Sequence, residues 1–272
     1  MKKAAGEITD MNKPLILVTN DDGIDSLGLA AAARAALRVG DVVISAPNEQ
    51  QTAMGRAYPL RDDIGVIDVV SLDLGLEQPV EAYAVHGSPG YAAAYGIWEI
   101  APKIKGRKPD ITVSGINIGA NCGTSITSSG TIGAALESVD MKVPALAISL
   151  EILDYDSWFH DFSGLDYSSA EKATEYWLKY ILEKGMPKDA DLLNVNVPQE
   201  VIGPEDYEFT FLERHPYYKV QPVPERDWSK PYMIRFDSEF GDKEAWAGSD
   251  IHTLHFLRKT SVTPITVDMT KR

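Results

Sequence analysis

Two adjacent carboxylates, Asp21 and Asp22, follow directly after an apolar run that begins at Leu15. A run of this kind, without polar alternation, is typical of a strand buried on both faces. Two carboxylates side by side repel each other, and hard divalent ions such as Mg²⁺ bind carboxylate oxygens. A metal site is therefore the first interpretation of this pair. The alternative is an ordinary turn, because Asn, Asp and Gly are common in turns for backbone reasons alone.

Two further oxygen donors follow other predicted strands. Thr52 lies in a polar loop after the apolar run 41–46, and Asn117 lies in a loop rich in Gly and Asn after the short strand 110–113. Loops that follow parallel strands meet at one edge of the sheet, so we expect both near the carboxylates. Together the four donors suit one Mg²⁺ or Mn²⁺ ion with room for water. The alternatives are a solvated hydroxyl for Thr52 and a turn residue for Asn117.

A possible anion site follows in the sequence Ser129-Gly130-Thr131, which precedes a helical stretch of small residues. Free backbone N–H groups, two hydroxyls and the positive end of the helix would point to one place there. The alternative for Ser129 is an ordinary helix cap. Asn121, in the preceding loop, could reach metal or substrate oxygens.

The elements that must position these residues alternate between strands and helices. This order predicts a mostly parallel sheet with helices on both faces. Expected strands begin at Leu15 and cover 41–46, 80–85, 110–113, 143–150 and 192–197; expected helices cover 24–38, 89–100, a stretch from 129, and 163–185.

The chain after Pro198 differs in composition, being rich in Pro, aromatic and charged residues. We expect an α/β core over 14–198 and an extended, hairpin-bearing region over 199–272 that could pack on a partner chain. Short β-like pieces are predicted at 207–212, 232–236, 251–256 and 261–267.

Composition narrows the classes of function. The chain has 272 residues, 44% of them hydrophobic, and its 40 acidic against 26 basic residues give a net charge of −14. A large footprint on duplex nucleic acid is therefore not expected. A small anionic substrate remains compatible with this negative net charge if a metal and helix N-termini supply local positive potential. With Cys122 as the one cysteine, no intrachain disulfide can form, and without an apolar leader or span we expect a soluble, cytoplasmic protein.

Several motifs in order resemble the survival protein E (SurE) family of metal-dependent nucleotide phosphatases. The resemblance covers nearly the whole chain from Pro14 and is dense to Leu150. The segments that carry it are 18–24 (Val-Thr-Asn-Asp-Asp-Gly-Ile), Ala46-Pro47 with Thr52, Gly87-Ser88-Pro89, 114–123 and Ser129-Gly130-Thr131 with Ala134-Ala135, with weaker echoes at 193–198 and 261–264.

The resemblance implies a Rossmann-like core whose C-terminal extension swaps between subunits of a dimer, which could pair into a tetramer. It also implies hydrolysis of nucleoside monophosphates, and in some members of 3′-nucleotides or short polyphosphate. One divalent ion, Mg²⁺ or Mn²⁺, is implied on Asp21, Asp22, Thr52 and Asn117. We expect Asp21 and Asp22 to be catalytic, and substrate to be bound by Asn121, Ser129, Gly130 and Thr131.

The chain departs from the family pattern at four places, none of which removes a predicted metal-ligand type. Thr52 stands where the family usually has Ser, which keeps the hydroxyl but stiffens χ1. The other three departures border the expected pocket and leave substrate preference open. They are Gly90-Tyr91 where Ala-Asp is usual, Ser128 where Tyr is frequent, and Arg258-Lys259 where Gly-Tyr is usual.

The expected mechanism is metal-assisted hydrolysis, in which the ion acts as a Lewis acid and lowers the pKa of a bound water. Fixed donors at the helix end would meet the charge that develops on the phosphate, and one aspartate would orient the water. A covalent aspartyl-phosphate on Asp21 ranks lower, because that carboxylate is already expected to be a metal ligand.

Two other functions stay open. One is a hydrolase of polyphosphate or other small phosphomonoesters, which Arg56, as the only cation near the motifs, supports weakly. The other is a non-catalytic nucleotide-binding regulator.

Overall fold

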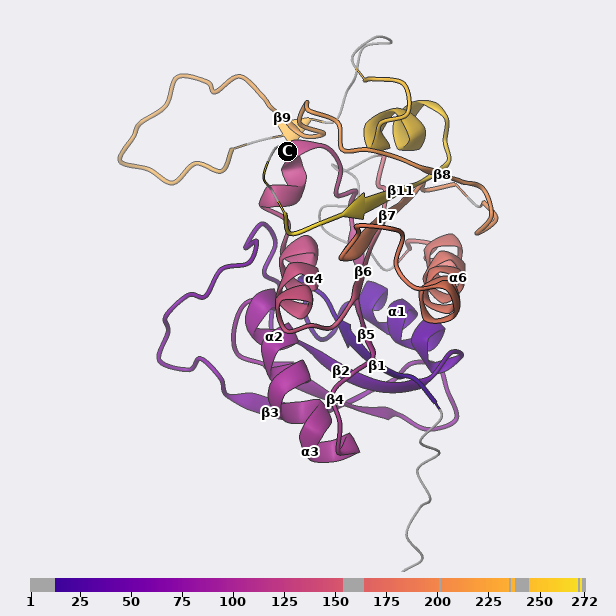
Figure 1. Cartoon of the computed structure of the whole chain (residues 1–272). Coiled ribbons are helices and arrows are strands. Elements are labelled where there is room, and N and C mark those ends of the chain that lie inside the picture. Colours follow the sequence, from indigo (N-terminus) through magenta and orange to yellow (C-terminus); the bar gives the residue numbers. More distant parts are fainter. Residues whose placement is uncertain are drawn as a thin grey trace, which may run out of the picture.

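The computed structural model describes residues 13–153, 164–200, 202–234, 236–237, 245–268 and 270. A nine-stranded sheet runs through its centre in the order β3-β4-β2-β1-β5-β6-β7-β11-β8 (Figure 1). The strands are β1 (Leu15–Thr19), β2 (Asp41–Pro47), β3 (Ile67–Leu72), β4 (Val80–Val85), β5 (Ile111–Ile118), β6 (Ala145–Leu150), β7 (Leu192–Val197), β8 (Tyr207–Phe209) and β11 (Thr260–Ile265).

The sheet is mostly parallel, as predicted. Strands β4, β2, β1, β5, β6 and β7 are parallel neighbours, while β3 and β11 run antiparallel to β4 and β7. Strand β2 pairs with one edge of β1, and β5, later in the chain, pairs with the other edge of β1. The crevice beyond the carboxyl ends of β1 and β5 is therefore a topological switch point, where ligands bind in open α/β sheets.

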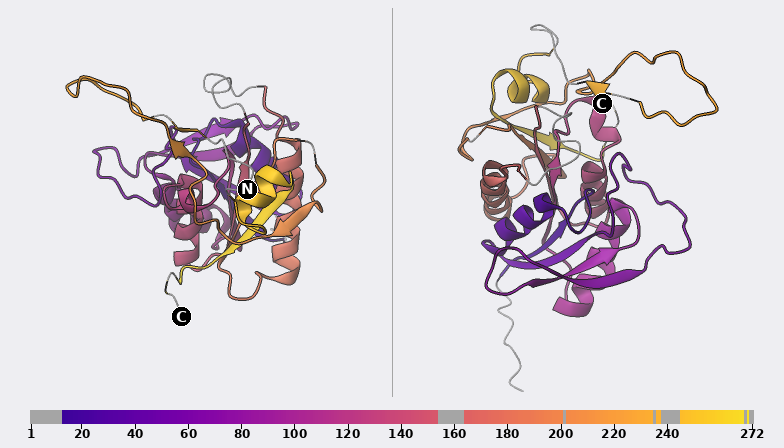
Figure 2. Two further views of the ribbon diagram at one scale, coloured as in Figure 1. Left: turned by 90° about the horizontal axis from the view of Figure 1, so that it is seen from above. Right: turned by 180° about the vertical axis from the view of Figure 1, so that it is seen from behind.

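Helices cover both faces of the sheet (Figure 2). The side chains of β1 explain why its run is apolar throughout. Ile16 and Val18 join the core under α1 (Leu27–Leu37) and α6 (Ser168–Lys184), while Leu15 and Leu17 join the core under α2 (Pro89–Tyr95) and η1 (Gly96–Ile100). No described helix has both the length and the hydropathy to cross a membrane. The helices are α1 (Leu27–Leu37), α2 (Pro89–Tyr95), η1 (Gly96–Ile100), α3 (Ala101–Lys105), η2 (Thr124–Thr127), α4 (Gly130–Asp140), α6 (Ser168–Lys184) and η3 (His252–Phe256).

Strand β5 is longer than predicted. It continues through the Gly-rich stretch to Ile118, with a shift of register against β6 between Ser114 and Asn117. A Cβ on Gly115 would lie 2.2 Å from the carbonyl oxygen of Ile148, so the strand passes its neighbour more closely than any larger residue allows. Asn117 is consequently part of the strand end and not of a free loop.

The prediction of a β-like piece at 251–256 was wrong. This segment forms the helical turn η3, and both Ile251 and Leu254 are fully buried. The three-residue spacing of these two side chains matches one face of a helix. The helix that begins at Pro89 also runs beyond the predicted 100, through η1 and α3 to Lys105.

The region after residue 198 shares the main sheet with the rest of the chain. Strand β11 pairs with β7 from Ile265 opposite Leu192 to Ser261 opposite Asn196, and β8 pairs with β11. A separate two-stranded ribbon is formed by β9 (Lys219–Val220) and β10 (Phe236–Asp237). The chain between β9 and β10 projects away from the body of the molecule in every view (Figures 1 and 2).

Candidate functional site

Asp21 and Asp22 lie just beyond the carboxyl end of β1, at the switch point. The Asp21 side chain is only 3% exposed, and burial raises its pKa to about 6 although the Thr131 hydroxyl acts in the opposite direction. Burial and the neighbouring charge of Asp21 together raise the pKa of Asp22 to about 8. Burial therefore disfavours the charge of each carboxylate, and for Asp22 the charge of Asp21 adds to this, so a cation would favour ionisation of the pair.

The aspartate pair has no counter-ion among the residues that the structure describes. Within the described parts of the chain, no lysine, arginine or histidine forms an ion pair with either carboxylate. Three buried oxygens beside β1 and β2 also lack a hydrogen-bond partner, namely Thr19 Oγ1, Asn20 Oδ1 and Asn48 Oδ1. A carboxylate pair made of the buried Asp21 and the half-buried Asp22, with these spare neutral oxygens after β1 and β2, fits a hard divalent cation. No group of three or more His, Cys, Asp or Glu side chains that could hold a metal occurs in the described ranges, so neutral donors are needed here.

The segments that carry Thr52 and Asn117 both reach the aspartates. The backbone N–H of Gln51 donates to the carbonyl oxygen of Asp21 at 2.7 Å, and the N–H of Ile118 donates to Asp22 Oδ2 at 3.1 Å. Each predicted donor is thus the sequence neighbour of a residue bonded to one aspartate. The Thr52 side chain is exposed, and Asn117 donates its Nδ2 to the carbonyl of Gly119 at 2.7 Å.

The N-terminus of α4 faces Asp21. The Thr131 hydroxyl donates to Asp21 Oδ1 at 2.6 Å, and the backbone amides of Gly130 and Thr131 lower the pKa of the same carboxyl. Gly130 is required by close packing, because a Cβ there would lie 2.6 Å from the Cβ of Asp21. Ser129 caps the helix by accepting from the N–H of Ile132 at 3.2 Å, as its alternative interpretation predicted.

Asn121 is held by the neighbouring strands rather than projecting freely. Its Nδ2 donates to Ser149 Oγ at 3.0 Å, and its backbone N–H donates to Asn196 Oδ1 at 2.7 Å. Its carbonyl accepts from Asn194 Nδ2 at 2.8 Å and Asn196 Nδ2 at 3.1 Å. We did not predict this role for the two β7 asparagines. The available signal was their alternate placement in the otherwise apolar run Leu-Leu-Asn-Val-Asn-Val.

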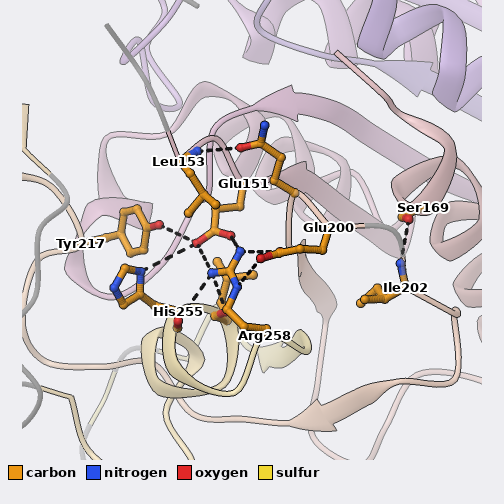
Figure 3. Close-up of polar contacts among 10 residues, drawn as sticks. Glu151, Leu153, Ser169, Glu200, Ile202, Tyr217, His255 and Arg258 are labelled. Atoms are coloured by element: carbon orange, nitrogen blue, oxygen red, sulfur yellow. Dashed lines mark hydrogen bonds and ion pairs between the residues drawn. The ribbon is translucent and has the colours of Figure 1, made fainter. Parts of the chain in front are cut away.

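A buried charge cluster lies beyond the end of β6 (Figure 3). The fully buried Glu151 receives two hydrogen bonds from Arg258, at 2.5 and 3.1 Å, and one from the Tyr217 hydroxyl at 3.0 Å. Arg258 also bonds Glu200, which follows β7. The departure from the family pattern at Arg258 therefore connects the C-terminal region to the carboxyl edge of the sheet, a role that the sequence did not reveal.

The geometry combines two capacities at one place. The paired carboxylates can hold a divalent cation, and the adjoining end of α4 supplies backbone N–H groups that favour an anion. Asp21 contacts the start of α4 directly, Gln51 and Ile118 bring the segments of Thr52 and Asn117 to Asp21 and Asp22, and Asn121 is linked to β6 and β7.

Comparisons with known proteins give relatives over almost the full length. Residues 16–219 match the family model described as survival protein SurE. The 5′-nucleotidase SurE of Methanobrevibacter smithii is 37% identical, with 93% of this chain and 95% of that protein covered. The 5′-nucleotidase SurE of Methanospirillum hungatei is 38% identical, with 96% and 88% covered. The crystal structure of SurE protein from Aquifex aeolicus matches with a TM-score of 0.71 and 26% identity over 95% of both chains. The resemblance inferred from the motifs is thereby confirmed: this chain belongs to the survival protein SurE family.

Proposed function

We propose that the protein is a divalent-metal-dependent 5′-nucleotidase that hydrolyses nucleoside monophosphates to nucleoside and phosphate. The observation that carries the proposal is the contact between the buried Asp21 and the first turn of α4, beside a second carboxylate, Asp22, whose ionisation is disfavoured. A cation and a phosphate dianion would meet at that contact. The names of the relatives, 5′-nucleotidase SurE, support the same reaction.

The proposed metal ligands are the carboxylates of Asp21 and Asp22, the hydroxyl of Thr52 and the amide oxygen of Asn117. Their chemistry suits Mg²⁺ or Mn²⁺, which bind carboxylate, hydroxyl and carbonyl oxygens and retain waters. When bound, the ion supplies a Lewis acid for a phosphate oxygen and lowers the pKa of a coordinated water.

The chain itself supplies orientation. The Thr131 hydroxyl holds one oxygen of Asp21, and the Ile118 N–H holds one oxygen of Asp22, so neither carboxylate is free to rotate. One of the two carboxylates then orients the attacking water. Ser129 and the backbone amides that begin α4, with Asn121, are the proposed donors to the remaining phosphate oxygens. Donors fixed in advance stabilise transition-state charge without reorganisation.

The test is release of phosphate from a panel of nucleoside monophosphates and polyphosphate, with Mg²⁺, Mn²⁺ or a chelator. We expect metal-dependent release from the monophosphates and its loss in Asp21→Asn, with the fold intact. Asp25→Asn is the matched control, because Asp25 is an exposed aspartate in the same turn.

Three results would contradict the proposal. Wild-type rates in Asp21→Asn or in chelator would remove the metal mechanism. Preference for polyphosphate over nucleoside monophosphates would favour a polyphosphate hydrolase. Nucleotide binding without turnover would favour a non-catalytic nucleotide-binding regulator.

We also propose that the region 199–272 exchanges its projecting segment, residues 221–234, between subunits of a dimer or tetramer. Support comes from large apolar side chains exposed on this segment, above all Trp228, at 89%, and Met233, at 72%. Light scattering should report a multiple of the 29.8 kDa chain mass, and a smaller species when residues 221–234 are replaced by a short linker. A monomeric wild type would contradict the exchange.

A further inference from the structure

The loop that carries Thr52, which we call the ligand loop (residues 48–58), is bonded firmly at its start. The N–H of Asn48 donates to the carbonyl of Val85 at 2.9 Å, and the N–H of Gln51 donates to Asp21 at 2.7 Å. Thr52 follows immediately, and its own side chain is exposed. Its position therefore depends on how the rest of the loop is held.

The far end of the ligand loop is held by a buried acid on α4. Arg56 Nε donates to Glu137 Oε2 at 2.6 Å, and Arg56 Nη2 donates to Asp140 Oδ2 at 2.7 Å. The Glu137 side chain is only 7% exposed, whereas that of Asp140 is 64% exposed. The Tyr58 hydroxyl is a second partner of Glu137, and its pKa is raised by burial and by this contact. A carboxylate as buried as Glu137 needs such partners, so removing Arg56 would leave its charge poorly compensated.

The backbone of the ligand loop also touches α4 directly. A Cβ on Gly133 would lie 2.2 Å from the carbonyl oxygen of Gly55, so only glycine permits this approach. The Ser88 hydroxyl donates to the carbonyl of Ala57 at 2.5 Å. The loop therefore rests on one fixed surface made by α4 and the start of α2.

The unusual pair Gly90-Tyr91 belongs to the same surface. The Tyr91 ring packs edge-on against Tyr58, with ring centroids 4.6 Å apart. Gly90 lies beside Tyr58 and the carbonyl of Ala57, 3.9 and 3.7 Å from where its Cβ would be, so a small side chain would also fit there and Tyr91 is the member of the pair that contacts the loop. The departure from the family pattern at Tyr91 thus supports the ligand loop.

We propose that Arg56 and Glu137 are positioning residues that set the affinity of the site for its divalent cation by fixing Thr52. The inference rests on the proposed function, in which Thr52 is a metal ligand. Helix α4 is the common frame: its first turn holds Asp21 through Thr131, and its last turns hold the Thr52 loop through Glu137. Partners behind the ligands typically change metal affinity by about 10–100-fold when they are removed.

The experiment is calorimetric titration of the full-length protein with Mn²⁺, without substrate. Arg56→Ala and Thr52→Ala should each weaken binding by about tenfold or more. Because Arg56 acts through Thr52, the double variant should bind no more weakly than the poorer single variant; independent effects would multiply instead. Arg56→Lys, which keeps one charged donor, should recover part of the loss.

Two control variants separate positioning from general stability. Asp140→Asn removes the exposed partner of the same arginine, and Arg38→Ala removes two ion pairs that join the end of α1 to α6. Both variants should bind Mn²⁺ within about twofold of wild type, because ion pairs at exposed positions contribute little to the stability of the fold. Thermal unfolding checks that each variant folds, and Glu137→Gln, which should weaken binding in the same direction, replaces Arg56→Ala if the latter does not fold.

The outcomes distinguish the two levels of the proposal. If wild type binds no Mn²⁺, the metal site is wrong and this inference falls with it. If wild type binds Mn²⁺ but Arg56→Ala matches Asp140→Asn, or if the effects of Arg56→Ala and Thr52→Ala multiply, the positioning role alone is overturned.

Discussion

Asp21 and Asp22 are acids whose surroundings disfavour their own charge. The pKa of each is raised, to about 6 and about 8, by burial and, for Asp22, also by the charge of Asp21. In an unfolded chain the pKa of the same groups is about 3.9. The metal-free folded protein therefore binds more protons than the unfolded chain between those values, and its free energy of unfolding must fall as the pH rises through that range.

This linkage predicts a pH-dependent effect of Asp22→Asn. Without metal, the variant should be stabilised relative to wild type, and by more at pH 8 than at pH 5.5, because wild type loses the protonated form as the pH rises. Mn²⁺ should reverse the order at pH 8 by binding the ionised pair. Thermal unfolding in chelator and in Mn²⁺ measures both effects. A stability difference that does not change with pH in chelator would contradict the raised pKa of Asp22.

At the scale of elements, the loop of Asn121 depends on strand β7. Replacing Asn196 by Leu should leave the buried N–H of Asn121 without its partner, at a cost of about 1–3 kcal/mol in unfolding free energy. We expect the KM for a nucleoside monophosphate to rise, with a smaller change in kcat, because Asn121 is a proposed substrate donor. Steady-state kinetics and urea unfolding measure the two effects.

The matched control is Thr263→Val on the adjacent strand β11. The Thr263 hydroxyl lies 2.7 Å from that of Thr210, so this variant also disturbs a buried polar pair, but one that does not contact Asn121. Equal changes of KM in both variants would show that Asn196 acts only through stability.

The elements near the site were the most predictable from sequence. The run from Leu15 is apolar on both faces because both faces are covered, so its pattern was informative. The end of β5 was not predictable, because Gly115 there permits a close approach to Ile148 that only the assembled sheet creates. The β-like prediction for 251–256 was wrong because the segment is too short for its periodicity to be decisive, and its buried side chains, Ile251 and Leu254, follow helical spacing.

The contacts that connect the site to its supports were not predictable either. The sequence pattern around each residue shows that Asp21 follows a strand and that Thr131 begins a helix. It does not show that the two side chains form a hydrogen bond with each other. Likewise, Arg56 and Glu137 are 81 residues apart and meet only through the packing of the ligand loop on α4. Long-range pairs of this kind depend on the whole fold.

At the scale of the molecule, the C-terminal region is fastened by the Glu151 cluster (Figure 3). Arg258→Ala would leave the fully buried Glu151 carboxylate without its cation, and we expect a loss of about 3–5 kcal/mol in unfolding free energy. Glu200→Gln, which removes the exposed partner of the same arginine, should lose at most about 1 kcal/mol. Urea unfolding measures both losses. Equal losses would show that the buried pair does not fasten this region.

The account as a whole depends on one cation held by four oxygen donors from three segments of the chain. The most direct measurement is anomalous X-ray scattering from crystals grown with Mn²⁺. We predict a single strong peak within about 2.0–2.6 Å of carboxylate oxygens of Asp21 and Asp22, with the Thr52 hydroxyl and the Asn117 amide oxygen in the same shell. A peak at another place, or none at saturating Mn²⁺, would contradict the proposed metal centre and the hydrolytic mechanism built on it.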